Sequence, residues 1–353
     1  MSELTDRDVR WLDAAVRLAR PTLGTLGGHP AVAALVVDED DGRAVARSVT
    51  GAEGSPTAVI AAIADAGMAA QGRTLYVTLE PSMEDARMVA AAGFARVVIG
   101  TAGSGSGVPA LLEEHGIDCV SANHPGSAEL NKAQAHRARK HRPLTTLCLA
   151  ISPDGMMARK DGMPLPLMGE AARDWLGMQR ALSDGVLIGG RTAELDDPPL
   201  TPGLRGMDDR PYVRVVALGS RPLPPALKML QGGHRVWVLC ERGKDFGLPP
   251  PVEFITLDSR NNHPDLRQGM AVLAGRGVAA LHVEGGAKLT EAMLAAELLD
   301  RIHLIETPIE VGRAGLPATA FGGIHGRLRG AGFVETESRE LGVDRLRTYE
   351  REF

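Results

Sequence analysis

The sequence contains few cysteines, few aromatic residues and no long apolar segment. Its three cysteines, Cys119, Cys148 and Cys240, are odd in number and widely spaced, which excludes a disulfide framework and a CxxC metal motif. We expect all three thiols to be buried in a reducing compartment. No segment reaches about 18 consecutive apolar residues, so we expect no membrane-spanning helix. The first 20 residues have the pattern of an amphipathic helix rather than a signal peptide, which predicts a cytoplasmic protein.

Neither acidic nor basic residues are in large excess. A net charge of −5 gives no general attraction to nucleic acid or to an anionic membrane, so we expect neither as a partner. One local stretch is basic, and its cationic residues are Lys132, His136, Arg137, Arg139, Lys140, His141 and Arg142. The stretch is typical of a solvated helix or linker, and a site for a phosphate or a partner is the alternative.

The length and the alternation of patterns predict two α/β domains. Aromatic residues make up only 3% of the chain, whereas its 42 glycines indicate many tight turns between strands and helices. A chain of 353 residues exceeds the usual size of one hydrophobic core, and we place the boundary between residues 141 and 142. The first domain alternates helices with apolar strands at 30–39, 74–81 and 95–101, which predicts a mostly parallel sheet covered on both faces, an α/β/α domain.

The second domain, residues 142–353, is predicted to be doubly wound. Short apolar runs alternate with helical patterns, which is typical of parallel strands joined by helices. Seven strands are expected, at 145–152, 184–190, 213–220, 234–240, 252–258, 279–286 and 300–311.

Two glycine-rich turns in the second domain are candidates for binding a pyrophosphate. "GGRT" (189–192) and "EGGAKLT" (284–290) each join an apolar strand to a helix. Free backbone N–H groups at a helix N-terminus attract anions, and glycine lets a phosphate approach the backbone. Ordinary strand-to-helix turns also use glycine, and the GxGxxG motif is absent. The two turns occur in order beside an Asp-Asp-Pro sequence at 196–198, which favours a nucleotide site.

A third turn contains Ser220 and Arg221 directly after a strand. An arginine in such a place can stack on adenine or pair with a ribose 2′-phosphate. The alternative is an exposed arginine with no ligand.

Six stretches carry a family resemblance: "LAISPDGMMA", "GVLIGGRTAELDDPPLT", "LHVEGGAKLTEAMLAAELLDRIHL", "GHPAVAALVV", "GSPTAVIAAIADAG" and "TLYVTLEP". The first three resemble the reductase half, and the last three the zinc deaminase half, of the bifunctional deaminase/reductase family of riboflavin biosynthesis. The resemblance covers nearly the whole chain. It implies an α/β fold in which a cytidine-deaminase-like domain precedes a dihydrofolate-reductase-like domain, and it implies a homodimer.

The resemblance also implies a reaction and a set of site residues. The reaction is the NADPH-dependent reduction of a small pyrimidine ribosyl phosphate, 5-amino-6-(5-phosphoribosylamino)uracil, at C1′ of its opened ribosyl group. Asp196 and Glu284 are the implied catalytic residues, and the implied substrate contacts are Arg180, Leu200, Arg205 and Glu284. The implied cofactor contacts are Ser152, Asp154, Gly189, Gly190, Thr192, Asp196, Ser220, Arg221, Gly285 and Gly286. For Glu284, an acidic residue at a helix N-terminus is the alternative.

The reductase half departs from the family pattern near the substrate. Cys148 stands where the family usually has lysine, Pro164 and Pro166 replace polar residues, and Gly203 stands in the place of an arginine, with Arg205 two residues on. Two alternatives therefore stay open: a reductase acting on another pterin- or pyrimidine-like compound, and a non-catalytic protein that binds a nucleotide.

The deaminase half departs from the family pattern at every functional position. Zinc in that chemistry needs a histidine, two cysteines and a glutamate that moves protons. Thr57 and Val59 stand where the histidine and the glutamate belong, Ser82 replaces the first cysteine, Asp85 lies near the second, and His29 replaces a substrate-binding asparagine. We therefore predict no zinc and no deaminase activity, with the domain retained for structure.

Overall fold

The computed structural model describes residues 3–103, 107–163, 165–219, 221–243, 247–248, 251–260, 263–319 and 323–351. Two of the predicted positions, Pro164 and Ser220, lie outside the described residues. The chain divides into two compact units, residues 1–135 and 136–353. The division falls within helix α6 (Lys132–Lys140), slightly before the boundary that the sequence predicts.

The first unit contains a five-stranded mixed sheet in the order β2-β1-β3-β4-β5. The pairs β3–β4 and β4–β5 are parallel, but β1 is antiparallel to both β2 and β3. Strands β2, β3, β4 and β5 therefore run in one direction and β1 alone is reversed, so the sheet is mostly parallel, as the sequence predicts. A short turn rather than a helix joins β1 to β2. The strands are β1 (Ala33–Asp38), β2 (Arg43–Val49), β3 (Thr74–Val77), β4 (Arg96–Ile99) and β5 (Asp118–Ser121).

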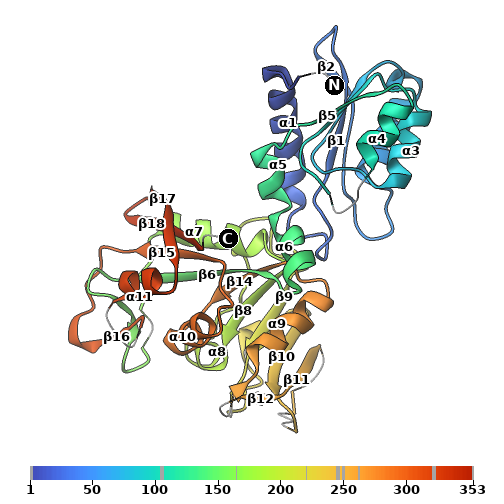
Figure 1. Ribbon diagram of the computed structural model, residues 1–353. Coiled ribbons are helices and arrows are strands. Elements are labelled where there is room, and N and C mark those ends of the chain that lie inside the picture. The colour runs from blue at the N-terminus through green and yellow to red at the C-terminus, as the bar shows by residue number, and fades with distance from the viewer. Residues whose placement is uncertain are drawn as a thin grey trace. The chain divides into compact units, whose positions relative to one another are not determined.

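Helices cover both faces of this sheet, as the sequence predicts (Figure 1). Leu12 and Ala15 of α1 and Leu130 of α5 pack on one face with Leu35 and Val37 of β1, while α2, α3 and α4 pack on the other. The helices are α1 (Asp6–Ala19), α2 (Ala58–Ala66), α3 (Met83–Ala91), α4 (Val108–Glu114) and α5 (Pro125–Leu130), with short 3-10 turns η1 (Arg20–Thr22) and η2 (Gly67–Ala70).

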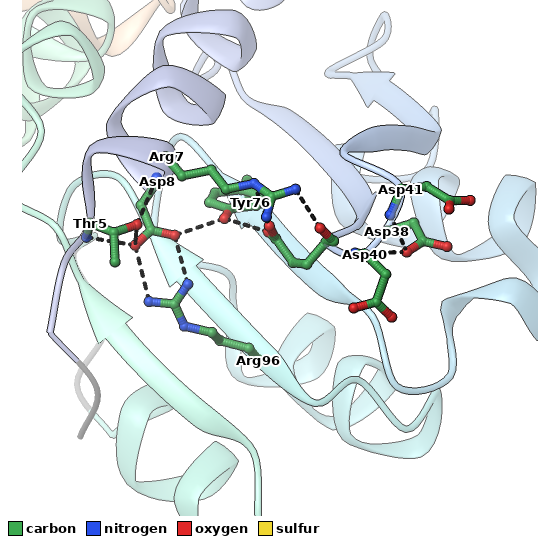
Figure 2. Close-up of polar contacts among 9 residues, drawn as sticks. Thr5, Arg7, Asp8, Asp38, Asp40, Asp41, Tyr76 and Arg96 are labelled. Atoms are coloured by element: carbon green, nitrogen blue, oxygen red, sulfur yellow. Dashed lines mark hydrogen bonds and ion pairs between the residues drawn. The ribbon is translucent and has the colours of Figure 1, made fainter.

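A buried cluster of charged side chains ties α1 to the sheet of the first unit (Figure 2). Asp8 is 1% exposed, and its carboxylate accepts hydrogen bonds from Arg96 at 2.6 and 3.1 Å and from the Tyr76 hydroxyl at 2.7 Å. Burial alone would raise the pKa of Asp8, but the hydrogen bonds from Arg96, Tyr76 and Thr5 outweigh burial and lower the pKa to about 2. Loss of Arg96 would leave Asp8 as a buried charge without an ionic partner, so the cluster fixes the position of α1.

The second unit contains a nine-stranded sheet in the order β11-β10-β9-β8-β14-β6-β15-β18-β17. All seven strands that the sequence predicts are present and mutually parallel. They are β6 (Leu144–Ile151), β8 (Gly185–Gly189), β9 (Val213–Ala217), β10 (Val236–Glu241), β11 (Val252–Leu257), β14 (Ala280–Glu284) and β15 (Arg301–Glu306). An antiparallel hairpin that the sequence patterns miss, β17 (Phe333–Leu341) and β18 (Asp344–Arg351), completes one edge.

Helices lie on both faces of this larger sheet. Met270 of α9, Met293 of α10 and Leu328 of α11 pack in the main core on one face, while Leu176 of α7 and Ala193 of α8 pack on the other. These helices are α7 (Glu170–Ala181), α8 (Gly190–Asp196), α9 (Leu266–Gly275), α10 (Ala287–Ala295) and α11 (Ile324–Gly330). The remaining elements are β7 (Met156–Arg159) paired with β16 (Gly315–Pro317), β12 (Ser259–Arg260) paired with β13 (His263–Pro264), η3 (Lys228–Leu230) and η4 (Gly312–Ala314).

Two predictions about the chain as a whole can be compared with this fold. Cys119, Cys148 and Cys240 are all buried, as expected. In the part of the chain that the structure describes, no helix is both long enough and apolar enough to cross a membrane.

Candidate active site

The centre of the candidate site is an ion pair at the C-terminal end of β14. Glu284 is the last residue of this strand, in register with Ile188 of β8 on one side and Cys148 of β6 on the other. Arg180 of α7 donates from Nε to Glu284 Oε1 at 2.6 Å and from Nη2 to Oε2 at 2.7 Å. The structure therefore brings together two of the predicted substrate-binding residues in a bidentate ion pair, the usual geometry of an arginine with a carboxylate.

The ion pair is largely removed from solvent. The side chains of Arg180 and Glu284 are only 16% and 17% exposed. Burial alone would raise the pKa of Glu284, but the Arg180 guanidinium outweighs burial and brings that pKa below its ordinary value. The same carboxylate raises the pKa of Arg180 in spite of burial. Both groups are therefore charged at neutral pH.

Beside this pair, the two predicted glycine-rich turns lie next to each other. They follow the neighbouring strands β8 and β14, and a Cβ built on Gly286 would lie 3.4 Å from the hydroxyl oxygen of Thr192. Gly189 and Gly286 occupy the N-cap positions of α8 and α10, and neither helix has a side-chain cap, whereas Asp265 caps α9. In addition, the buried Thr290 hydroxyl, in the first turn of α10, has no hydrogen-bond partner in the described part of the chain. Free backbone donors, an unused hydroxyl and missing side chains suit a bound pyrophosphate.

The loop after α8 is held in an uncommon conformation. Asp197 and Leu200 have positive φ angles of 40° and 53°, which non-glycine residues rarely adopt. The Leu200 carbonyl accepts a hydrogen bond from the buried hydroxyl of Tyr212, and the next carbonyl, of Thr201, accepts one from Arg180 Nη1 at 2.8 Å. Such strain persists only where the surroundings fix the backbone, which is common at ligand sites. The side chain of Leu200 is fully buried, so only its backbone is available to a substrate.

Three predicted residues lie at the surface near these elements. Asp196 is the last residue of α8, and its side chain is exposed. The protein around it removes part of the water from its carboxyl, which raises the pKa of that group. The side chain of Arg221 is 73% exposed, and its nearest described acidic partner is Glu194 at 3.9 Å. Arg205 is exposed in a turn. Asp196 and Arg221 are thus accessible to a ligand, while the structure does not bring Arg205 into the ion pair of Arg180.

Ser152 and Asp154 hydrogen-bond to each other within the turn that follows β6. The Ser152 hydroxyl donates to Asp154 Oδ1 at 2.5 Å, and Asp154 Oδ2 accepts from the backbone N–H of Gly312 at 2.7 Å. These hydrogen bonds fix the connection between β6 and β7 and tie it to the loop after β15. Their cofactor role stays a prediction.

Two residues of the site were not predicted from the sequence. His282 is 1% exposed on β14, and its Nε2 lies 3.4 Å from Glu284 Oε1. Tyr212 holds the Leu200 carbonyl. For His282 the sequence does contain a signal, because a histidine two residues before Glu284 on a strand points to the same face.

Comparison with known proteins identifies the family. The sequence profile of the RibD C-terminal domain matches residues 143–340, more than half of the chain. The chain belongs to the RibD family. RibD of Bacillus amyloliquefaciens is 29% identical over 335 residues, covering 88% of this chain and 87% of that protein. RibD of Escherichia coli (strain K12) is 27% identical over 360 residues, covering 96% and 98%.

Solved RibD structures share the fold of the whole chain. The diaminohydroxyphosphoribosylaminopyrimidine deaminase/5-amino-6-(5-phosphoribosylamino)uracil reductase of Thermotoga maritima matches with a TM-score of 0.86 at 24% identity, over 98% of this chain and 99% of that one. RibD of Acinetobacter baumannii matches with a TM-score of 0.83 at 24% identity, over 98% and 99%. The first unit is therefore deaminase-like and the second is a dihydrofolate-reductase-like RibD domain.

The deaminase-like unit of this RibD-family chain has no zinc-binding set at the predicted positions. Thr57 and Ser82 are the N-caps of α2 and α3, and the Thr57 hydroxyl donates to Asp85 Oδ1 at 2.8 Å. Asp85 in turn completes a capping box with Ser82. Val59 is buried and His29 is exposed. Hydroxyls and one carboxylate that already bond to each other do not match the histidine and thiolates that zinc prefers.

The described residues elsewhere offer no replacement for that set. No group of three or more His, Cys, Asp or Glu side chains is placed to hold a metal ion in the ranges that the structure covers. The residues present therefore do not fit a catalytic zinc.

Proposed function

We propose that the chain is an NADPH-dependent reductase that converts the ribosyl group of 5-amino-6-(5-phosphoribosylamino)uracil to ribityl, and that it has no deaminase activity. The observation that carries this proposal is the partly buried Arg180–Glu284 pair at the end of β14, directly beside the glycine turns that start α8 and α10, two helices without a side-chain cap. Charged groups for a polar, anionic substrate and a cradle for a pyrophosphate thus meet at the carboxyl ends of parallel strands, where open α/β sheets bind ligands.

In this proposal the protein binds and orients the two reactants. NADPH, when bound, supplies the hydride. The turns at Gly189 and Gly286, with Thr192, hold its pyrophosphate, and the exposed Arg221 pairs with its 2′-phosphate. Arg180 binds the phosphate of the substrate, Glu284 hydrogen-bonds its polar groups, and the strained loop at Leu200 positions its ring. Asp196, with its raised pKa, lies at the rim where a proton can be exchanged.

The cofactor cradle can be tested with a pair of glycine substitutions. Gly286→Ala adds a methyl group 3.4 Å from the Thr192 hydroxyl at an ordinary backbone angle, φ −72°, so the fold tolerates it but the phosphate does not. Gly275→Ala, at the end of α9, meets no atom within 4 Å and is the matched control. We expect Gly286→Ala to weaken NADPH binding by about tenfold, while Gly275→Ala binds like the wild type. Equal affinity of both variants for NADPH would remove the cradle from the proposal.

The lack of deamination makes a second prediction about the reaction sequence. If the first unit does not act, a separate hydrolytic deaminase must supply the deaminated substrate. The test is to give the enzyme NADPH with either the amino or the deaminated pyrimidine. We expect oxidation of NADPH only with the deaminated compound and no release of ammonia from the other. Release of ammonia from the amino compound would contradict the proposal.

A second candidate function, reduction of another pyrimidine- or pterin-like compound, is favoured by Cys148. This residue is in register with Glu284, and burial, followed by the charge of Glu284, raises the pKa of its thiol. A neutral thiol supplies no positive charge beside the carboxylate, where the family usually has a lysine. The same pair of assays, extended to pterin substrates, distinguishes the two candidates.

For assembly we propose a homodimer and a domain boundary near residue 141.

A further inference from the structure

Glu284 has two basic neighbours, and both lower its pKa, but only one of them makes short hydrogen bonds to it. Arg180 approaches from α7 and donates two hydrogen bonds of 2.6 and 2.7 Å. His282 lies on the same strand face, and its Nε2 is 3.4 Å from Glu284 Oε1, too far for a well-formed hydrogen bond. His282 is 1% exposed, and its Nε2 has no hydrogen-bond partner in the described part of the chain. A buried ring nitrogen without such a partner is costly and calls for a functional reason.

Binding of an anionic substrate creates a conflict at this pair. The Nε and Nη2 edge of Arg180 is occupied by Glu284, and Nη1 is occupied by the Thr201 carbonyl. Arg180 has one further N–H on each of Nη1 and Nη2, and a phosphate that binds there shares the guanidinium with the carboxylate. The attraction between Arg180 and Glu284 is then weaker, and a largely buried carboxylate with less compensation for its charge opposes binding. A second donor within reach of the carboxylate would remove this penalty.

We propose that His282 is a positioning residue that donates a hydrogen bond to Glu284 when an anionic group of the substrate engages Arg180. A shift of a few tenths of an ångström brings the carboxylate within hydrogen-bond distance of Nε2. No other described group accepts a hydrogen bond from this ring nitrogen. Thr146 of β6 and Val186 of β8 stand opposite His282 in the sheet, and His303 of β15 is a more distant basic neighbour. The inference rests on the proposed binding of a substrate phosphate by Arg180.

The test uses ribose 5-phosphate as the probe and two substitutions of His282. His282→Phe fills the same space without a donor, and His282→Gln restores an N–H near the place of Nε2. Calorimetry measures the affinity of each protein for ribose 5-phosphate, with NADPH affinity and Tm as controls. We expect His282→Phe to weaken the phosphate ligand by about tenfold or more, as for loss of a hydrogen bond to a charge. His282→Gln should stay within about threefold of the wild type.

The outcomes separate this proposal from the proposed function. Weaker ribose 5-phosphate binding in His282→Phe, recovered in His282→Gln at unchanged NADPH affinity, supports the positioning role. Equal binding by all three proteins overturns it and leaves the reductase proposal intact. If the wild type binds NADPH but no ribose 5-phosphate, Arg180 is not an anion site, and the positioning role falls with it. Failure of the wild type to bind NADPH is the separate result that overturns the reductase.

Discussion

Removing the Asp85 carboxylate should destabilise the deaminase-like unit through the loss of its hydrogen bonds. Asp85 is 5% exposed, accepts a hydrogen bond from Thr57 at 2.8 Å and completes the capping box of α3 with Ser82. It thereby joins the N-termini of α2 and α3, at the positions that the family resemblance assigns to zinc ligands. The perturbation is Asp85→Ala, and the matched control is Glu84→Ala, which removes an exposed acid from the same first turn.

The expected magnitude follows from these contacts. A hydrogen bond from a hydroxyl to a buried carboxylate is worth about 1.5 to 3 kcal/mol. Ser82 remains as the N-cap, and loss of its N3 partner, which accepts from the Ser82 N–H at 3.4 Å, costs less than the roughly 1 kcal/mol of a lost cap. Because the two contributions share one side chain and are not additive, we expect Asp85→Ala to lower the free energy of unfolding by about 2 to 3 kcal/mol. Glu84→Ala loses only the interaction of a charge with the helix dipole, about 0.3 to 1 kcal/mol.

Urea unfolding of both variants, with and without a chelator, measures this difference. The two compact units can unfold separately, so hydrogen exchange of the amides of α2 and α3 is followed alongside. The reasoning is refuted if Asp85→Ala costs no more than Glu84→Ala. It is also refuted if a chelator destabilises the wild type, because a bound metal would then be contributing to the stability of this unit.

Three further predictions concern other charged side chains. Glu284→Gln should lower kcat/KM for the deaminated substrate by at least about tenfold through loss of a charged contact, as measured by steady-state kinetics, and an unchanged value would refute the substrate role. Arg221→Ala should weaken NADPH by about tenfold and leave NADH unchanged, and an unaltered NADPH to NADH affinity ratio would exclude pairing with the 2′-phosphate. Ionised Asp8, with its pKa of about 2, should contribute about 2 kcal/mol of stability that is fully present above about pH 4 and lost as the pH falls through 2. The stability difference between the wild type and Asp8→Asn should therefore shrink between pH 4 and 2 in urea titrations, and a constant difference would contradict this.

The parallel strands were predictable because each is a short apolar run, but the hairpin at the sheet edge was not. In β17, "FVETESREL", the residues from Val334 to Glu340 are all exposed. This part of the strand has no buried face, so its sequence does not alternate between apolar and polar residues. The same reason applies to β2, which has one buried residue. Edge strands with few buried side chains are fixed by pairing with their neighbours, and pairing partners are not encoded locally.

The site residues were predictable one by one, but their connections were not. Arg180 and Glu284 are 104 residues apart, and their pairing depends on the packing of α7 over the end of β14. Ser152 and Asp154 belong to a matching motif, yet their hydrogen bonds fall within a turn. His282 lies within a matching stretch and Tyr212 lies in none, but the sequence assigns a role to neither, because they act on neighbouring groups, Glu284 and the Leu200 carbonyl.

A chain with a reductase site and no working zinc site should reduce its substrate without bound metal. Purified protein is treated with a chelator, its zinc content is determined, and the oxidation of NADPH is followed with the deaminated ribosylaminopyrimidine phosphate. We expect turnover at an unchanged rate with no bound zinc. Binding of NADPH without turnover, or a rate that requires zinc, would contradict it.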